Sequence, residues 1–402
     1  MTKRLYHELP NLTTCLATVL ACKKTENGYE ILLNQTVLFP EGGGQLSDEG
    51  FLNDIPVFHV REEGESVFHE TKTPLDVGKE VTVQLNEEKR RDHSVQHTGE
   101  HILSGVANTL FNAVNVGFHM AEDYVTIDLD KFLDEAQLTK LEREANRAVQ
   151  ANMPVTVSIV DEHALEHLKL RKQAKGLTGD IRIVEVNGAD SCTCCGTHTA
   201  TSGEVGIIKI TAAAKYKGGT RIWFACGMRA VYASRKEHEI LDLLARRFST
   251  KAEDVPDAVQ KQFDEHATLR AELKKRTETL FSMQTETLLQ SAATVKGIKV
   301  VVHTVQGFSA QELRSFSEKL LAGGKTVAAI FSVNGGNVNY FLARSTDVNF
   351  SMKQACDAAN ALFSGKGGGR DDSAQGSAPY TGESVFTDAV SQYREYLLRA
   401  VS

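Results

Sequence analysis

The sequence has no long apolar run, few cysteines and no excess of positive charge. No segment approaches the roughly 20 consecutive apolar residues of a membrane-spanning helix, so we expect no membrane association. Seven cysteines among 402 residues are too few for a disulfide-stabilised scaffold. Because the formal net charge is −7, no global positive field favours nucleic acid, and any RNA contact must come from local groups of Lys and Arg.

The composition is typical of a globular chain with several domains. Hydrophobic residues make up 41% and charged residues 24%, which excludes disordered, collagenous and low-complexity classes. At roughly 100–200 residues per domain, two or three domains are expected, each with its own core. Polar residues interrupt the segment Met1–Cys22, so we expect no signal peptide and a cytoplasmic protein.

Four stretches that differ in composition and hydrophobic pattern predict an α+β multidomain fold. Residues 1–90 alternate short β-rich runs with Gly and Asn, which predicts a small sheet or barrel. Residues 91–232 mix helix and strand, and residues 233–296 are helical and almost free of glycine. Residues 297–402 return to strand–helix alternation, which predicts a small α/β domain.

Hydrophobic periodicity predicts the main elements of each stretch. The expected helices are Gln96–Phe111, Glu135–Gln150, Ser234–Phe248, Ala310–Leu321 and Lys353–Leu362, with a longer helix after the polar break Ser249–Pro256. The expected strands are Thr13–Ala21, Tyr29–Leu33, Pro56–Val60, Val81–Leu85, Tyr124–Leu129, Ile181–Val186, Ile207–Ile210, Ile222–Phe224, Ile298–His303, Thr326–Ser332 and Tyr340–Ala343. Gly365–Gly369 is expected to be a loop. The imperfect heptad of the long helix favours an antiparallel hairpin or a local dimer arm over a regular coiled coil.

The sharpest local pattern is a pair of histidines, His97 and His101, in a predicted helix. A spacing of four residues puts both rings on one helix face, where they can converge on one metal ion. His93, a further four residues upstream, makes His93 with His97 a competing pair. Glu100 lies off this face, so we expect it to be exposed to solvent rather than to act as a general base.

A second group of soft ligands follows a predicted strand. Cys192, Cys194 and Cys195 precede His198, and thiolates with imidazole form a zinc-type donor set. One of these cysteines, His198 and the two helical histidines together supply four nitrogen and sulfur ligands. Both Cys194 and Cys195 stand at a plausible distance from His198, so spacing alone leaves the register open. The surplus cysteines are expected to be small packing residues.

Two glycine-rich segments can bring backbone close to a ligand. The first, Thr36–Asp48, holds three consecutive glycines between an apolar strand and a polar turn, where an ordinary hairpin is the commoner alternative. The second, Gly365–Ser377, combines backbone N–H groups with Lys366 and Arg370. Such a segment can hold phosphate or an RNA terminus, although a flexible linker is the alternative.

In combination these motifs resemble the free-standing alanyl-tRNA editing proteins of the long AlaX type, which are related to the editing and C-terminal regions of alanyl-tRNA synthetase. Five segments carry the resemblance, in the family's order: Phe39–Gln45 (FPEGGGQ), His97–Leu103 (HTGEHIL), Gly117–Met120 (GFHM), Cys194–His198 (CCGTH) and Gly367–Gly376 (GGGRDDSAQG). The synthetase's activation domain has no room before residue 1, so we expect neither tRNA charging nor ATP binding.

The resemblance implies a metal site and the nature of each domain. The family's HxxxH and CxxxH motifs imply one zinc ion per chain, held by His97, His101, Cys194 and His198. His93 is then structural or supports the ligands, and the family usually has Gly where Cys195 stands. Residues 1–90 would form the Gly-Gly-Gln barrel, residues 91–232 the zinc-containing editing domain, residues 233–296 a helical arm and residues 297–402 a DHHA1-like domain.

The implied activity is hydrolysis of the ester that joins a wrong amino acid, chiefly serine and secondarily glycine, to the acceptor end of tRNA(Ala). A pocket cannot exclude alanine by size, because serine is larger. The pocket must instead contain a polar group that the serine hydroxyl can pair with and the alanine methyl cannot. A buried polar group left unpaired costs about 1–3 kcal/mol. Thr36, Gln45 and the backbone near Gly117–His119 are the candidates for this contact. Cys194 is the expected ligand at the reaction centre.

The resemblance also implies partners. The residues expected to contact tRNA are Lys215, Lys217, Arg221, Lys366 and Arg370, of which the first three lie in a run where basic and flexible residues coincide. A homodimer through the helical arm and C-terminal domain is expected from apolar positions on the arm. Two other functions stay open: a non-catalytic tRNA-binding protein with a structural zinc, and a metallohydrolase acting on a small ester or amide.

Overall fold

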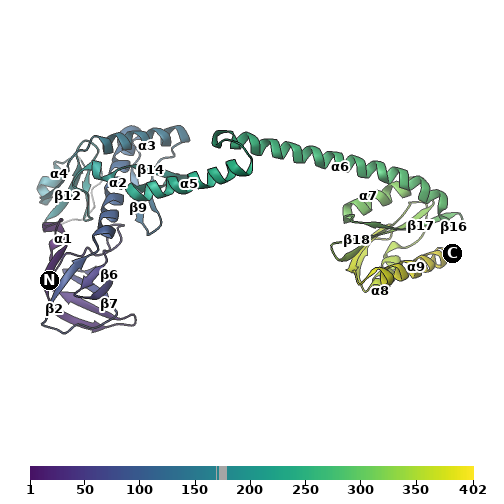
Figure 1. The fold of residues 1–402 in the computed structure, drawn as a ribbon, viewed down its shortest axis with the longest axis horizontal. Helices are drawn as coiled ribbons and strands as arrows, with labels where there is room; N and C mark the ends of the chain where they lie inside the picture. Colours follow the sequence, from purple (N-terminus) through teal and green to yellow (C-terminus); the bar gives the residue numbers. More distant parts are fainter. Residues whose placement is uncertain (169, 172–178) are drawn as a thin grey trace. The chain divides into compact units, whose positions relative to one another are not determined.

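The computed structural model describes residues 1–168, 170–171 and 179–402, and it divides into two compact units, unit 1 (residues 1–252) and unit 2 (residues 253–402) (Figure 1). Each unit has its own clusters of buried apolar side chains. The predicted α+β multidomain fold is confirmed. In the part of the chain that is described, no helix combines the length and apolar character needed to cross a membrane.

Unit 1 begins with a closed six-stranded barrel, in the strand order β2-β3-β7-β6-β5-β8. Its strands are β2 (Thr14–Lys24), β3 (Tyr29–Leu33), β5 (Gly50–Leu52), β6 (Ile55–Glu63), β7 (Ser66–Thr71) and β8 (Glu80–Leu85), and beside it β1 (Lys3–Arg4) pairs with β4 (Gln35–Thr36) and is followed by α1 (Leu5–Glu8). Alternate apolar residues such as Ile31, Leu33 and Val83 fill the interior. Strand β7 was not predicted, because His69 and Thr71 occupy two of its buried positions and disguise the alternation.

The helix that follows the barrel, α2 (Glu87–Phe111), is longer than predicted and begins at Glu87 rather than Gln96. Its first turns are charged and lack the apolar periodicity on which the prediction rested. Asn86 caps the helix by accepting a hydrogen bond from the Lys89 N–H, and Glu87 and Glu88 complement the positive end of the helix dipole. The capping therefore fixes the start of α2 where hydrophobic pattern does not.

Two antiparallel sheets and further helices complete unit 1. The four-stranded sheet has the order β14-β15-β10-β9 and the three-stranded sheet the order β11-β12-β13. The elements are β9 (Asn115–Met120), β10 (Val125–Leu129), α3 (Glu135–Gln150), β11 (Val155–Val160), α4 (Glu162–Glu166), β12 (Ile181–Val186), β13 (Asp190–Thr193), a 3-10 turn (Ser202–Val205), β14 (Ile208–Tyr216), β15 (Gly219–Cys226) and α5 (Gly227–Arg247). Ile102 and Leu103 of α2 pack with Ile127, Leu141 and Phe224 in the core.

Unit 2 holds a six-stranded mixed sheet with helices on both faces. The sheet has the order β16-β17-β18-β19-β21-β20. Its elements are a 3-10 turn (Ala252–Asp254), α6 (Val255–Ser291), β16 (Ala293–Val295), β17 (Ile298–Gln306), α7 (Ala310–Leu321), β18 (Thr326–Asn334), β19 (Asn337–Arg344), α8 (Met352–Phe363), β20 (Lys366–Gly369), β21 (Ser373–Pro379) and α9 (Glu383–Ala400). Leu313 and Phe316 of α7 join Phe281 of α6 on one face, whereas Met352 of α8 and Tyr393 of α9 cover the other.

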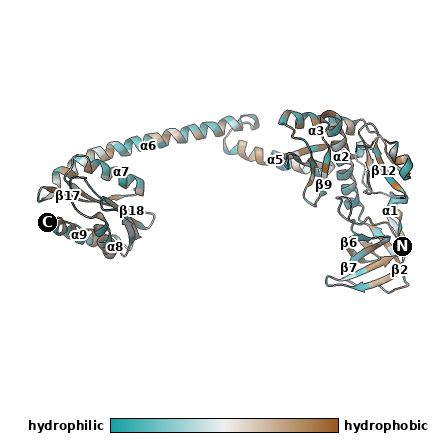
Figure 2. Cartoon of the chain, turned by 180° about the vertical axis from the view of Figure 1, so that it is seen from behind, coloured by the Kyte–Doolittle hydropathy of each residue, from teal (hydrophilic) through white to brown (hydrophobic). Residues whose placement is uncertain are grey.

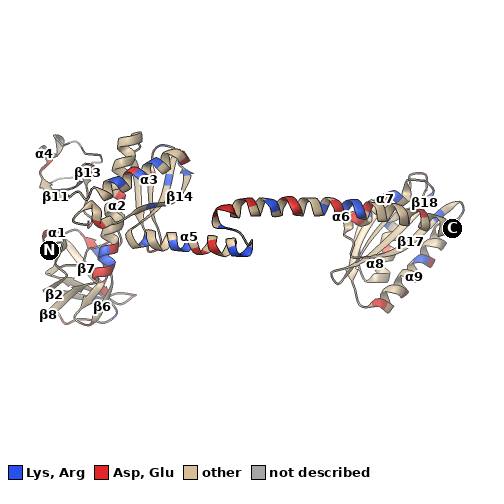
Figure 3. Cartoon of the chain, turned by 45° about the horizontal axis from the view of Figure 1, so that its top comes forward, with Lys and Arg blue, Asp and Glu red and all other residues tan. Residues whose placement is uncertain are grey.

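The long helix α6 is mostly exposed. Among its residues only Val255 and Phe281 are buried, and Figure 2 shows polar and apolar residues interspersed along it. Figure 3 shows that Lys and Arg alternate with Asp and Glu on the same helix, where Lys261 pairs with Glu265 at one turn's spacing. Such pairs add a few tenths of a kcal/mol each to an exposed helix.

The glycine-rich segment near residue 365 is a strand, which corrects the predicted loop. β20 is the edge strand of the sheet and pairs with β21. A Cβ on Gly369 would come within 2.3 Å of the Ser373 carbonyl oxygen. The glycines therefore serve a close approach of two backbones, and low apolar content conceals the strand from sequence patterns.

Candidate metal centre

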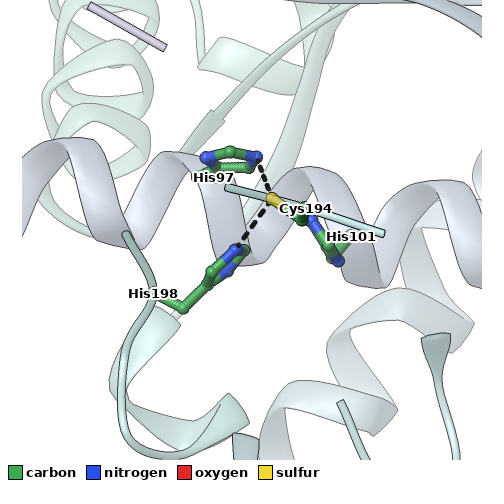
Figure 4. A group of neighbouring side chains, drawn as sticks. All are labelled: His97, His101, Cys194 and His198. Atoms are coloured by element: carbon green, nitrogen blue, oxygen red, sulfur yellow. Dashed lines mark hydrogen bonds between the residues drawn. The ribbon is translucent and has the colours of Figure 1, made fainter. Parts of the chain in front are cut away.

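Four predicted ligands from two distant segments meet inside unit 1. His97 and His101 come from α2, and Cys194 and His198 from the loop after β13 (Figure 4). One ligand atom of each residue lies within 4.8 Å of the others. The Cys194 Sγ is 3.5 Å from His97 Nε2 and 3.3 Å from His198 Nε2. This buried His/Cys cluster is compatible with a metal site.

Each histidine of the cluster is held through Nδ1 by a different partner. His97 Nδ1 donates to Gln45 Oε1 (2.7 Å) and His101 Nδ1 to Asp190 Oδ2 (2.9 Å), whereas His198 Nδ1 lies 3.3 Å from Thr98 Oγ1. In such hydrogen bonds the partner fixes the tautomer and the ring orientation. The Nε2 atoms are thereby left as ligand atoms.

Gln45, which sequence analysis offers as a substrate-recognising residue, is a positioning residue for His97. Its Oε1 also accepts from the Thr197 N–H (3.0 Å), and its Nε2 donates to Thr197 Oγ1 (2.9 Å). The side chain is completely buried. Both the oxygen and the nitrogen of its amide therefore form hydrogen bonds within the protein. Through this residue the barrel end of the chain contacts the cluster.

The support of His101 extends through Asp190 to Arg171. Arg171 Nε donates to Asp190 Oδ1 (2.5 Å) and Arg171 Nη2 to Asp190 Oδ2 (3.0 Å). Burial alone raises the pKa of Asp190, but the hydrogen bonds from His101 and Arg171 outweigh it and lower that pKa to about 2. An ionised carboxylate thus stands behind the ligand histidine, as is common at metal sites.

Electrostatics favour the ligand forms of Cys194 and His198. Burial alone raises the pKa of the Cys194 thiol, but the neighbouring His97 imidazole and hydrogen bonding with His101 hold it well below its usual value. Burial lowers the pKa of His198 to about 3, which keeps this imidazole neutral. The loop comes this close because residue 196 is glycine: a Cβ there would lie 2.2 Å from His97 Cε1.

The cluster lies on a cavity of about 620 Å3. Besides His97, His101 and Cys194, its walls include Arg4 and His7 beside the barrel, Gly43, Glu100, Asn115, Phe118, Arg171, Arg182, and the exposed apolar residues Val157 and Ile159 of β11. A buried donor cluster therefore opens into a chamber large enough for a small organic group.

Glu100 is buried, which corrects the predicted exposed side chain. It is 4% exposed, and its Oε1 accepts from Ser104 Oγ (2.6 Å) and Asn115 Nδ2 (2.6 Å). The prediction assumed that α2 buries one face, but sheets and barrel surround this helix, so faces cannot be assigned from periodicity. Sequence reasoning also passed over Arg171 and Asn115 of the same cavity, since single polar residues carry no pattern.

Among the other residues singled out in the sequence, Thr36 and His93 lie outside the cavity, whereas Phe118 and Cys195 line it. Thr36 is buried, with its Oγ1 at 2.8 Å from His69 Nε2, and it is not among the described residues that line the cavity. Cys195 is exposed and outside the His/Cys cluster, although it lines the cavity. His93 is fully buried, and neither ring nitrogen has a hydrogen-bond partner within the described chain.

The predicted tRNA-binding residues lie on or next to two strand pairs, β14–β15 in unit 1 and β20–β21 in unit 2. On the β14–β15 hairpin, Lys215 Nζ lies 4.8 Å from the centre of the Phe132 ring, and Arg221 stacks 3.8 Å over Tyr216 while pairing with Asp128 at 2.6 Å. Lys217 is at the tip of this hairpin. In unit 2, Lys366 and Arg370 flank the glycines of β20, and both are exposed.

Comparison with known proteins connects this centre to a family. Residues 297–398 match the DHHA1 domain, and residues 181–222 match the threonyl and alanyl tRNA synthetase second additional domain. The alanyl-tRNA editing protein AlaX-L of Pyrococcus horikoshii is 27% identical over 416 aligned residues, which cover 99% of this chain and 100% of that protein. This chain is a homologue of AlaX-L over its full length. The predicted resemblance to the AlaX type is confirmed.

Two further relatives of this AlaX-L homologue are matched over part of their length. The alanyl-tRNA editing protein Aarsd1 of Danio rerio is 32% identical over 243 residues, covering 60% of this chain and 59% of that protein. The alanine–tRNA ligase of Pyrococcus abyssi is 29% identical over 390 residues, covering 93% of this chain and 42% of the ligase. The chain thus spans less than two thirds of either relative.

The support of His97 by Gln45 generates a first prediction. Gln45→Met removes the acceptor from His97 Nδ1 with little change of volume, so we expect metal affinity to fall by about 10- to 100-fold. The measurement is competition for zinc with a chromophoric chelator. Gln84→Met, on an exposed barrel position, is the matched control and should leave the affinity unchanged. Equal affinities of both variants would show that Gln45 does not position the ligand.

Proposed function

We propose that this AlaX-L homologue is a trans-editing hydrolase that deacylates mischarged tRNA(Ala) in the cytoplasm, chiefly Ser-tRNA(Ala) and secondarily Gly-tRNA(Ala). The observation that carries the proposal is a buried His/Cys cluster opening into a cavity of about 620 Å3. Homology to AlaX-L over the full chain supports the reaction class.

We propose that the cluster holds one zinc ion per chain. Tetrahedral zinc with bonds of about 2.3 Å to sulfur and about 2.0 Å to nitrogen separates these ligand atoms by roughly 3.5 Å. The observed separations from Cys194 Sγ are 3.5 and 3.3 Å, so the donor set fits. His97, His101, Cys194 and His198 would hold the ion. When bound, zinc supplies a Lewis acid and fixes the wall of the cavity.

The chain's own residues would bind and orient the aminoacyl ester. The aminoacyl group enters the cavity toward Cys194, and the terminal nucleoside rests at the mouth, where exposed Val157 and Ile159 lie with Arg4, His7 and Arg182. Water then attacks the ester carbonyl, and the ribose oxygen leaves with a proton. Gln45 and Asp190 keep the imidazoles of His97 and His101 in place throughout.

One observation favours a second candidate function. Four protein donors complete a zinc coordination shell, which is typical of structural sites, whereas catalytic sites keep one position open. The alternative is therefore a tRNA-binding protein in which zinc only stabilises the fold. Hydrolysis assays separate the two functions.

The neighbouring cysteines 194 and 195 provide the test of the proposed function. Cys194→Ala should reduce bound zinc and lower single-turnover hydrolysis of Ser-tRNA(Ala) by more than about 100-fold, because a ligand is lost. Cys195→Ala is the matched control and should keep the bound zinc, since Cys195 is exposed and outside the cluster. Zinc content and circular dichroism are measured on the same preparations. Tight tRNA binding by the wild type without hydrolysis of any ester would favour the structural-zinc alternative.

We propose that tRNA is contacted by Lys215, Lys217 and Arg221 in unit 1 and by Lys366 and Arg370 in unit 2. Basic side chains next to exposed aromatic rings, as on the β14–β15 hairpin, suit a nucleic-acid surface. The exposed glycine backbone of β20 gives a phosphate close access to Lys366 and Arg370.

Removing basic residues of the hairpin should weaken tRNA binding without altering the chemistry. The double variant Lys215→Ala/Lys217→Ala is expected to raise the Kd for tRNA(Ala) and to make the logarithmic salt dependence shallower by about 1 per lost phosphate contact. Single-turnover rates at saturating enzyme should stay unchanged. Lys23→Ala/Lys24→Ala, at exposed positions of β2, is the charge-matched control. The same salt slope in both double variants would contradict this contact.

We further propose a homodimer through the helical arm and C-terminal domain. Leu269, Leu273, Leu280 and Met283 recur at three- to seven-residue spacing on α6 and are exposed. Sedimentation at micromolar concentration should give a dimer, and Leu273→Glu should shift it to a monomer while Lys274→Glu should not. A wild-type monomer at that concentration would exclude the dimer.

A further inference from the structure

One donor of the cavity has no assigned role. Arg171 is 6% exposed at its side chain and lines the cavity. Its Nε and Nη2 donate to Asp190, but Nη1 is buried without a hydrogen-bond partner among the described residues. An unpaired buried N–H is unfavourable unless a ligand satisfies it.

The guanidinium of Arg171 is held by Asp190, and the backbone of this residue is anchored to β13. The Arg171 backbone N–H donates to the Ser191 carbonyl of β13 at 2.8 Å. Asp190 bridges Arg171 to His101, so one carboxylate separates the guanidinium from the metal centre. Arg171 Nη2 lies 3.9 Å from Glu100 Oε1. The guanidinium with the unpartnered Nη1 and the buried Glu100 carboxylate therefore lie side by side in the wall of the cavity.

We propose that Arg171 recognises the serine hydroxyl, with Nη1 donating to the hydroxyl oxygen and the Glu100 carboxylate accepting the hydroxyl proton. This inference rests on the proposed deacylation and names the residue that sets its specificity. A hydroxyl satisfies both groups at once, because it donates and accepts. The methyl of an alanyl ester does neither and leaves Arg171 Nη1 unpaired, which protects correctly charged tRNA. A glycyl ester leaves room for water at Nη1, so its hydrolysis survives without the contact.

A second arginine of the cavity provides a comparison. Arg182 also has an unpartnered buried nitrogen, Nε, but its Nη1 donates to the carbonyls of Cys194 (2.7 Å) and Gly196 (3.1 Å). Its established contacts hold the loop that carries the metal ligands. Replacing Arg182 should therefore affect every ester alike, whereas replacing Arg171 should affect the seryl ester selectively.

The test compares esters that differ only in the hydroxyl. tRNA(Ala) is charged with serine, with glycine or with α-aminobutyrate, in which a methyl replaces the hydroxyl of serine. Wild-type enzyme is expected to hydrolyse the seryl ester about 10- to 100-fold faster than the α-aminobutyryl ester, the cost of leaving buried polar groups unpaired. In Arg171→Lys the ammonium still pairs with Asp190 but cannot replace Nη1. The ratio should then fall to near one, and since the esters are compared on one preparation, any change in zinc content affects their rates alike.

The possible results distinguish a failure of this inference from a failure of the proposed deacylation. A zinc-free fraction lowers all rates and leaves the ratio unchanged, so the ratio reports on Arg171 even in a partly inactive preparation, and Arg171→Gln repeats the measurement. Arg182→Lys should keep the wild-type ratio. An unchanged ratio in both Arg171 variants would overturn the inference while leaving deacylation intact. Hydrolysis of no ester by the wild type would instead overturn the proposed function.

Discussion

Unit 1 depends on the packing of α2 against the loop that follows β13. This contact brings His97 and His101 to Cys194 and His198, and it buries polar side chains that need partners. The partners come from separate elements: Gln45 from the end of the barrel, Asp190 from β13 and Thr98 from α2 itself. Because each imidazole takes its orientation from a different element, the barrel, the sheet and the helix must all be in place before the four ligand atoms converge.

The same burial sets the protonation states of the centre. Desolvation favours a neutral His198, and the imidazoles favour a thiolate at Cys194. These are the forms that bind a metal, so a metal would offset part of the cost of burying them. Metal affinity and stability of unit 1 are consequently linked. Residues from other segments, such as Gln45, orient the side chains of this centre.

Unit 2 combines a covered sheet with an exposed edge. Its sheet is covered on both faces by apolar helices, whereas its edge strand β20 is glycine-rich and exposed. The exposed edge leaves backbone N–H groups and two basic side chains available to a polyanion. The His/Cys cluster of unit 1 and the exposed edge of unit 2 are thus supported by independent cores, and the DHHA1 match lies within unit 2.

The sequence by itself determined elements whose local signal agrees with their tertiary setting. Glu135–Gln150 and Ala310–Leu321 have the predicted bounds, because each is amphipathic and opens with a capping box. The metal-ligand motifs and the resemblance to the AlaX type could also be recognised in the sequence, since ligand chemistry restricts residue type and spacing. Only the tertiary structure decided what depends on neighbours from elsewhere in the chain. It buried Glu100 on a helix enclosed on all sides, turned Gln45 toward His97, removed Thr36 from the cavity and left Arg171 Nη1 without a partner. These roles depend on contacts between segments that are distant in the sequence, and the periodicity of one segment cannot predict such contacts.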